Sequence, residues 1–198
     1  MCGWSRHVVQ VPGLRLQSPS VQDLRAMFAG ATDPQAQRWL GWTDRRVQQA
    51  RQWTGLLGAE PGQGRWLPRA PDSPVMYLAA VDPSGRRLAG WISFSRERGE
   101  IDGWLAPGFR GRGLGAGLFA GAAEFGHHCL GTASVLAGTK AENAACIGAL
   151  SAAGFVPAAG PETHELPNGR VVTARWFRHE SVRPAHCSAS PRRSRVDP

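Results

Sequence analysis

The run Arg110-Gly111-Arg112-Gly113-Leu114-Gly115 constrains the fold more than any other part of this sequence. It follows a candidate strand, Glu100 to Leu105, and a Pro-Gly turn, and it leads into a helical pattern. The first N–H groups of a helix lack internal partners, and the helix dipole adds positive potential there. Glycines let the backbone approach a ligand without a Cβ in the way. Arg110 and Arg112 add formal charge, so the run predicts a phosphate site built mostly of backbone.

The spacing of the run separates it from two familiar phosphate loops. A P-loop ends in Gly-Lys-Ser/Thr, which is missing here, and the dinucleotide fingerprint needs glycine where this chain has Ala116. Ordinary turn glycines and an RNA-binding Arg-Gly segment stay open as alternatives. RNA-binding Arg-Gly segments are repetitive, whereas this run occurs once, between a strand and an amphipathic helix.

Hydrophobic periodicity predicts an α/β (α+β) domain. Helices are expected from Ser20 to Gly30, with Ser20 as N-cap, from Thr43 to Leu57, after the glycine run, and from Asn143 to Ala153; Asp33-Pro34 reads as a turn. Strands are expected at Leu14 to Leu16, Val75 to Val81, Leu88 to Phe94, Glu100 to Leu105, Ala133 to Ala137, Phe155-Val156 and Val171 to Phe177. We expect an N-terminal extension over 1–10, the domain over 11–180 and a basic disordered tail over 181–198.

The formal net charge of +8 comes almost entirely from arginine, because Lys140 is the only lysine. A basic chain favours anionic partners, and a phosphate-rich cofactor accounts for part of the excess without nucleic acid. The four cysteines lack the spacing of a zinc site or a disulfide framework. No signal peptide and no apolar run of membrane-spanning length is visible. We therefore expect a soluble, cytoplasmic protein without a metal.

Three motifs in order identify a family resemblance. They are Arg110, Gly113 and Gly115 in the pattern Arg/Gln-x-x-Gly-x-Gly/Ala; Asn143, Cys146 and Gly154-Phe155 in the pattern Asn-x-x-Ser/Ala followed by Gly-Phe; and the upstream segments Leu14-Arg15-Leu16, Asp33-Pro34 and Arg38-Trp39-Leu40-Gly41-Trp42. From about Leu14 to Phe177 the chain resembles the GCN5-related N-acetyltransferases, and within them the ribosomal-protein-alanine acetyltransferase-like branch.

The resemblance implies a fold, a co-substrate and a set of binding residues. The fold is a mixed, mostly antiparallel central sheet that splays at the acetyl-CoA site and is flanked by about four helices. The strand end pairs with the pantetheine arm, Asn143 hydrogen-bonds that arm, and loop amides bind the pyrophosphate. The cofactor-binding residues are then Leu105, Arg110, Gly111, Arg112, Gly113, Leu114, Gly115, Ala116 and Asn143.

Acetyl transfer to an amine needs a base for the amine and an acid for the departing thiolate. Glu100 and Asp102 share one face of their strand, and Glu100 is the first candidate for the base because the branch often has Glu there; a solvated strand face is the alternative for both. Many relatives use a tyrosine acid where this chain has Leu150, and its only tyrosine is Tyr77. The Cys146 thiol could donate a proton, or it could be a small core residue.

The acceptor is expected to be a primary amine, either a protein N-terminus or a small molecule. A catalytically silent acyl-CoA-binding protein of the same fold is the first alternative, because the tyrosine is missing. An RNA- or ribosome-binding protein is the second, although nucleic acid is not an expected partner. A monomer and a homodimer both stay open.

We assign no functional role to the other polar and aromatic clusters. His127, His128 and Cys129 are adjacent on one helix, so their side chains point in different directions and no metal is expected. His164 and Glu165 fall near the acceptor side without an assigned role. Trp39, Trp42, Trp53 and Trp66 either line a pocket or pack the first helices.

Overall fold

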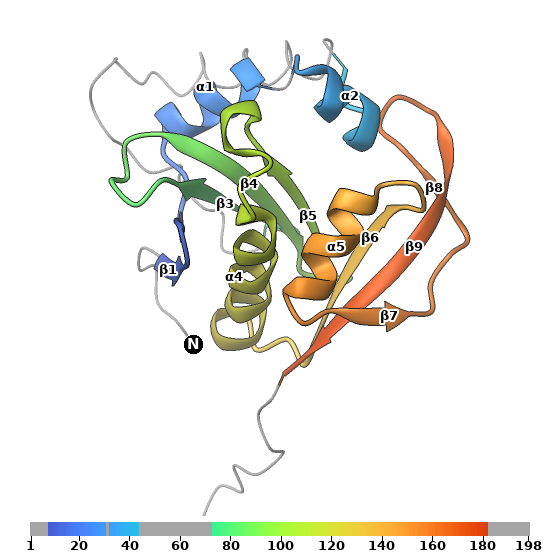
Figure 1. Ribbon diagram of the computed structural model, residues 1–198. Helices are drawn as coiled ribbons and strands as arrows, with labels where there is room; N and C mark the ends of the chain where they lie inside the picture. Colours follow the sequence, from blue (N-terminus) through green and yellow to red (C-terminus); the bar gives the residue numbers. More distant parts are fainter. Residues whose placement is uncertain (1–7, 31, 44–72, 182–198) are drawn as a thin grey trace, which may run out of the picture.

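The computed structural model describes residues 8–30, 32–43 and 73–181 (Figure 1). Its helices are α1 (Val21–Gly30), α2 (Pro34–Leu40), α4 (Leu114–Cys129) and α5 (Ala144–Ala152), with a 3-10 turn at Pro107–Phe109. Its strands are β1 (Val8–Val11), β2 (Leu14–Gln17), β3 (Val75–Val81), β4 (Leu88–Ser95), β5 (Glu100–Leu105), β6 (Ser134–Lys140), β7 (Val156–Ala158), β8 (Thr163–Glu165) and β9 (Val171–Glu180).

The strands form one sheet in the order β1-β2-β3-β4-β5-β6-β9-β7, and β8 pairs with β9. Every neighbouring pair is antiparallel except β5 and β6, which run parallel. The predicted fold, a mixed and mostly antiparallel sheet flanked by helices, is therefore confirmed within the described residues.

The two parallel strands separate partway along their length. Their register contains only Glu100↔Leu136 and Ile101↔Ala137. Beyond these pairs β5 continues to Leu105 beside β4 alone, and β6 continues to Lys140 beside β9 alone. We call this wedge between Asp102–Leu105 and Gly138–Lys140 the splay, and it leaves backbone of both strands without a ladder partner in the middle of the sheet.

The two faces of the sheet carry different hydrophobic cores. Alternation along the strands sends Leu78 and Ile101 toward α4 and α5, where Phe94 and Phe125 are buried. The opposite face, which we call the α1–α2 face, buries Trp91 and Trp104 under residues of α1 and α2. In Figure 1, α4 and α5 lie in front of the sheet and α1 and α2 lie above it.

Several predicted elements keep their predicted bounds because local signals define them. α1 begins after Ser20, whose side chain accepts a hydrogen bond from the Asp23 N–H while the Asp23 carboxylate accepts bonds from the N–H and Oγ of Ser20. This reciprocal cap fixes the start of the helix. β3 and β5 cover the predicted residues, and β9 extends the predicted strand to Glu180.

Three elements differ from the sequence-based expectation. The Asp33-Pro34 turn is wrong: Asp33 caps α2 by accepting a hydrogen bond from Ala36 N, and Pro34 occupies the first turn of that helix. β1 lies partly within residues 1–10, where no pattern was recognised, and β8 was not predicted. The helix expected from Thr43 to Leu57 and the tail over 182–198 fall outside the described residues.

At the far end of α4 from the glycine run, two histidines form a hydrogen-bonded pair. His127 Nδ1 lies 2.6 Å from the carbonyl of Thr132, so this nitrogen must carry the proton that it donates. His127 Nε2 lies 3.0 Å from Nδ1 of His179, within hydrogen-bond distance. Burial, with His127 nearby, lowers the pKa of His179 below its usual 6.5.

We expect this pair to weaken the fold in mild acid. Because the folded pKa of His179 lies below 6.5, the unfolded chain takes up the proton first, and the free energy of unfolding falls as pH drops below about 6.5. His179→Asn keeps a donor near the Nδ1 position but cannot titrate in this range, so the variant should lose that part of the pH dependence. Urea unfolding between pH 5 and 8 measures it; His128→Asn on the exposed side of α4 should behave as wild type, and identical profiles for all three proteins would contradict the assignment.

Candidate functional site

The glycine loop, residues 110–115, forms a concave stretch of backbone at the start of α4. Gly111 and Gly113 both have left-handed backbone, with φ of 70° and 73°, and Gly113 is the N-cap of the helix. A Cβ built on either glycine would meet no atom within 4 Å, so the space in front of them is open. Alternating left-handed residues at a helix start direct successive N–H groups into one hollow, which suits an anion.

The N–H groups of the loop are available to a ligand. Within the described chain, the N–H groups of Gly111, Arg112 and Gly113 donate to no other residue. The first N–H groups of α4, beginning with Leu114, have no acceptor one turn earlier. The exposed Arg112 side chain lies over the Phe109 ring, 5.6 Å from its centroid, beside the loop.

Gly115 has a different task from the other two glycines. A Cβ at this position would lie 2.9 Å from the Cβ of Ala149 in α5. Gly115 therefore allows α4 and α5 to pack closely at Ala149, and this contact holds α5 beside the first turn of α4. Ala116 follows in the first turn of α4.

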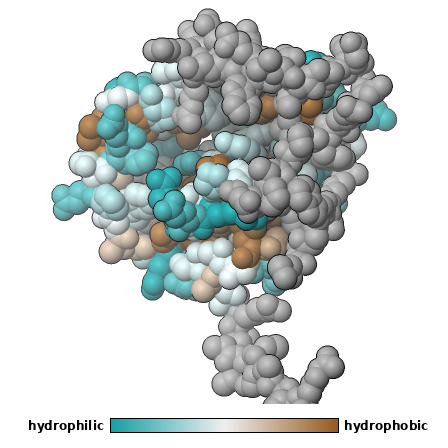
Figure 2. All heavy atoms as spheres, turned by 180° about the vertical axis from the view of Figure 1, so that it is seen from behind, coloured by the Kyte–Doolittle hydropathy of each residue, from teal (hydrophilic) through white to brown (hydrophobic). Residues whose placement is uncertain are grey.

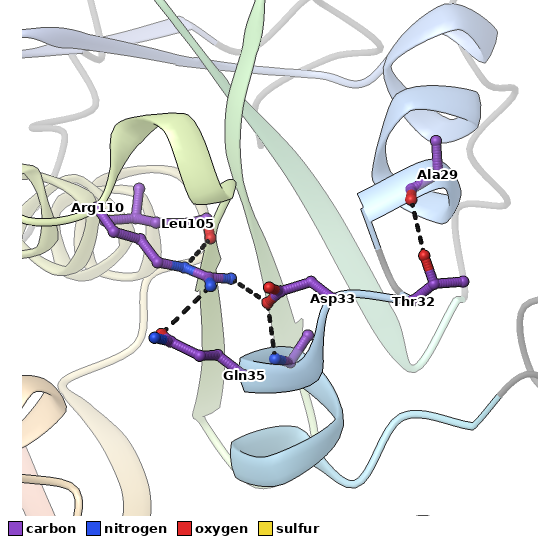
Figure 3. Close-up of polar contacts among 7 residues, drawn as sticks. Ala29, Thr32, Asp33, Gln35, Leu105 and Arg110 are labelled. Atoms are coloured by element: carbon purple, nitrogen blue, oxygen red, sulfur yellow. Dashed lines mark hydrogen bonds and ion pairs between the residues drawn. The ribbon is translucent and has the colours of Figure 1, made fainter.

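The Arg110 side chain points away from the open side of the glycine loop and bonds to β5 and to the start of α2 (Figure 3). Its guanidinium donates to the Leu105 carbonyl at 2.8 Å, to Oε1 of Gln35 at 3.2 Å and to the Asp33 carboxylate at 2.6 Å. Its backbone N–H bonds to the Pro107 carbonyl. Arg110 was expected to place its charge beside a phosphate; instead the charge is paired with Asp33, and the side chain joins β5 to the start of α2.

Asp33 thus holds α2 in two ways, by capping it and by binding Arg110. Burial alone would raise the pKa of Asp33, but hydrogen bonds from Arg110 and from the Ala36 N–H outweigh burial and hold the pKa below its usual value. The two paired side chains are 23% and 13% exposed, so solvent screens this ion pair less than a surface pair.

We expect Asp33→Asn to destabilise the protein by about 1–3 kcal/mol, the range for a hydrogen bond to a charged group. Asparagine caps helices as well as aspartate does, so the cap survives and only the charge on Arg110 loses its partner. Thermal and urea unfolding of Asp33→Asn, Arg110→Gln and the double variant give the coupling energy. Additive effects of the two substitutions would contradict the pairing.

Glu100 lies where β5 and β6 still pair, on the α1–α2 face. Its side chain is 12% exposed and forms an ion pair with Nε of Arg98 at 3.1 Å. Burial raises the pKa of Glu100 above its usual 4.5, Asp102 raises it further, and Arg98 and His164 act against them. The carboxylate therefore keeps a higher proton affinity than an exposed glutamate. The sequence did not assign this effect of His164 on Glu100.

Asp102 is the first residue of β5 inside the splay, and its charge acts on Cys146 of α5. Burial raises the pKa of the Cys146 thiol, the Asp102 charge raises it further, and a hydrogen bond with Thr139 acts in the opposite direction. The thiol therefore holds its proton at neutral pH. Cys146 lies in the first turn of α5, where its N–H bonds to Oδ1 of the N-cap Asn143 at 3.2 Å. Asn143 keeps its amide NH₂ group unbonded within the described chain.

The structure also places the only tyrosine on the site's side of the sheet. Tyr77 of β3 is opposite Ser93 of β4, and Ser93 is opposite Asp102 of β5, so the three form a row on the α1–α2 face. The Ser93 hydroxyl donates to Asp102 at 3.3 Å. Leu150, by contrast, is fully buried in the core. Strand pairing, which a single sequence does not reveal, creates this row.

The tryptophans of the first helices divide between two arrangements. Trp42 packs on Trp104, with ring centroids 5.7 Å apart, and belongs to the core of the α1–α2 face. Trp39 lies beside Arg38 and Lys140. Trp53 and Trp66 are outside the described residues.

Seen from behind, the described residues show hydrophilic and hydrophobic side chains next to one another on the surface (Figure 2).

Metal binding and membrane insertion can be considered for the described residues. Among the described residues, no group of three or more His, Cys, Asp and Glu side chains could hold a metal ion. None of the helices in the described ranges is long and apolar enough to cross a membrane.

Comparison with known proteins points in one direction. The sequence pattern of the acetyltransferase (GNAT) domain matches residues 13–156. No curated protein matches the chain significantly. Among solved structures, a GNAT-family acetyltransferase from Bacillus anthracis superposes with a TM-score of 0.66 at 12% identity, covering 88% of this chain and 98% of that one.

Two other solved structures contain ligands. Spermidine N-acetyltransferase from Vibrio cholerae, in complex with CoA and spermine, gives a TM-score of 0.65 at 15% identity over 85% of this chain and 96% of that one. The ribosomal L7/L12 α-N-protein acetyltransferase, in complex with coenzyme A, gives 0.66 at 14% identity over 88% and 98%. At such identities these structures support the fold.

Proposed function

Because the chain belongs to the acetyltransferase (GNAT) domain family, we propose that it transfers the acetyl group of acetyl-CoA to a primary amine by direct attack on the thioester. The observation that carries the proposal is the glycine loop beside the splay. Gly111 and Gly113 form a hollow that a Cβ would fill, at the start of a helix and next to unpaired strand backbone.

The chain fits coenzyme A on two grounds. The N–H groups of Gly111 to Ala116 suit the pyrophosphate, because a helix start and left-handed glycines both present donors to an anion. The unpaired edge of β5 suits the amide-bearing pantetheine arm as an added strand. The free amide NH₂ of Asn143 is a donor for the same arm. The Leu105 carbonyl already accepts a hydrogen bond from Arg110, so Leu105 serves by its position at the end of β5.

When bound, acetyl-CoA supplies the activated acetyl group, and the residues of this chain handle the protons. Glu100 accepts a proton from the amine, directly or through water, and its raised pKa brings it closer to the ideal of a base at neutral pH. Asp102 is the second candidate. Cys146, whose thiol stays protonated, is the candidate donor to the leaving thiolate.

A protein N-terminus is the first acceptor class, in keeping with the branch that acetylates ribosomal proteins, and small amines such as polyamines are the second. Calorimetric titration with coenzyme A tests the donor side. Mass spectrometry of a panel of N-terminal peptides, polyamines and small amines, each incubated with acetyl-CoA, tests the transfer. Absence of coenzyme A binding at millimolar concentration would falsify the proposal.

A silent acyl-CoA-binding protein is the second candidate, favoured by the buried Leu150 at the position of the family's tyrosine acid. The same panel separates the two functions. Binding of coenzyme A without transfer to any amine would favour the silent protein, whereas one acetylated acceptor with turnover above the uncatalysed rate favours the enzyme.

A further inference from the structure

Three cationic side chains meet where the end of α2 reaches the end of β6. Lys140 Nζ and Arg170 Nη2 donate to the same atom, the backbone oxygen of Arg38, at 2.6 and 2.8 Å. The Arg38 guanidinium lies 4.5 Å from the centroid of the Trp39 ring, and Lys140 Nζ lies 5.4 Å from it. We call Arg38, Lys140 and Arg170 the cation cluster.

No carboxylate balances this cluster in the described part of the chain. The ion pairs there are Arg98–Glu100, Arg110–Asp33 and Arg178–Glu180, and none includes a member of the cluster. Lys140 is nevertheless only 6% exposed. Burial, with Arg170 and Arg38 nearby, lowers its pKa, and Glu142 only partly opposes them. The cluster thus combines one buried ammonium group with two exposed guanidinium groups, and no described carboxylate forms an ion pair with it.

The cluster also keeps unused hydrogen-bond donors. An ammonium has three donors and a guanidinium five. Lys140 uses one of its three on the Arg38 carbonyl, and Arg170 uses only Nη2 on carbonyls of α2. The Arg38 side chain donates to no described residue. Capping the helix end therefore leaves several donors for an external anion, and the planar guanidinium groups suit carboxylate or phosphate oxygens.

The position of the cluster relates it to the acceptor rather than to the glycine loop. Lys140 ends β6 on one side of the splay, whereas Glu100 and Asp102 lie on β5 on the other side. α2 packs on the face that Glu100 and Asp102 share. From the register, strand rise and strand spacing, Lys140 lies on the order of 10 Å from Asp102 and on the order of 14 Å from Glu100. The α1–α2 face thus presents carboxylates for an amine. About the length of three extended residues away, it presents cations that form no ion pair with a described carboxylate.

We propose that the cation cluster binds an anionic group of the acceptor, so that the preferred acceptor is a primary amine carrying a carboxylate or phosphate on the order of 10 Å from its nitrogen. This inference rests on the proposed function, since it names the acceptor class of the same site. The proposed function requires acetyl transfer to an amine, whereas this inference requires that the protein select acceptors by their negative charge.

The test measures binding of matched peptides to the protein saturated with coenzyme A. The probes are the tripeptide amides Ala-Ala-Asp and Ala-Ala-Asn, which differ only in one charge, and Ala-Ala-phosphoserine as the phosphate arm. We expect the Asp peptide to bind about tenfold more tightly than the Asn peptide, a difference typical of a charge-assisted contact. A stronger effect of phosphoserine identifies phosphate as the better ligand, and a weaker one identifies carboxylate.

Arg170→Gln is the test variant, and Arg175→Gln is its matched control. Both arginines are exposed and lose the same charge, but Arg175 is opposite Thr139, on the sheet face toward α5. Arg170→Gln should reduce the Asp/Asn preference to less than about threefold and leave the affinity for coenzyme A unchanged, whereas Arg175→Gln should keep the preference. An acetylation assay with the same peptides should give the same ratios in kcat/KM.

Each failure has a separate meaning. Equal affinity for the Asp and Asn peptides, or no detectable binding of either at 10 mM (about 2.7 kcal/mol is needed even for that affinity), overturns the inference. So does weaker coenzyme A binding in Arg170→Gln, because the cluster would then belong to the donor side. Loss of coenzyme A binding by the wild-type protein would instead overturn the proposed function.

Discussion

Replacing Gly113 with aspartate should weaken coenzyme A binding at least about 100-fold, which corresponds to about 2.7 kcal/mol. Gly113 has a φ of 73°, and a Cβ there meets no protein atom, so the new side chain enters open space in front of the helix start. The proposed pyrophosphate occupies that space. A carboxylate would take the same backbone donors and repel the phosphate charges.

Two controls separate charge from conformation. Gly113→Asn introduces a side chain of the same shape without the charge, and asparagine tolerates left-handed backbone best among residues with a Cβ. It should weaken binding about tenfold or less. Gly131→Asp repeats the strain elsewhere, because Gly131 has a φ of 72° and open space around its Cβ, beyond the other end of α4. Calorimetry should find wild-type affinity for Gly131→Asp; equal losses in both aspartate variants would show that strain, not phosphate exclusion, is responsible.

The sequence predicted most of this fold because several of its signals are local. The Ser20 cap, the Val75 to Val81 strand and the glycine loop each depend on residues close together in the chain. The predicted fold and family, an acetyltransferase (GNAT) domain, are confirmed by the family match and by the similarity to solved structures. The roles given to individual site residues remain predictions.

The misread turn at Asp33-Pro34 has a physical reason. Aspartate and proline are common at the first positions of a turn and also at the N-cap and first turn of a helix. α2 has only seven residues, which is too short for a periodic pattern to decide between the two. The deciding contact is the ion pair with Arg110, which lies 77 residues away along the chain.

Pairing across the sheet was equally hidden. Tyr77, Ser93 and Asp102 become neighbours only through strand register, and Lys140 approaches Arg38 only because α2 crosses to the end of β6. Sequence spacing constrains contacts within a helix or strand, whereas these contacts depend on how separate elements pack. The conformation of the glycine loop was therefore predictable from local sequence, whereas the contacts between separate strands and between α2 and β6 were not.

Glu100→Gln should lower kcat by about 100- to 10,000-fold, the usual contribution of a general base, and it should also stabilise the protein at neutral pH. The second effect follows from the raised pKa of Glu100. Because the folded state holds this proton more tightly than the unfolded chain, stability falls as pH rises from about 4.5 through the folded pKa. At neutral pH the folded protein carries a partly buried charge, which glutamine removes. The lost partner, Arg98, is mostly exposed, so its ion pair contributes little.

Opposite changes in activity and stability distinguish a missing base from a damaged fold. Thermal unfolding should show a higher melting temperature for Glu100→Gln at pH 7, and the difference should vanish below about pH 4.5, where the carboxyl group is protonated in both states. Asp102→Asn is the matched control: Asp102 is exposed and hydrogen-bonded to Ser93, so its loss should change kcat less. A larger loss of kcat in Asp102→Asn than in Glu100→Gln, with coenzyme A affinity intact in both, would transfer the role of base to Asp102.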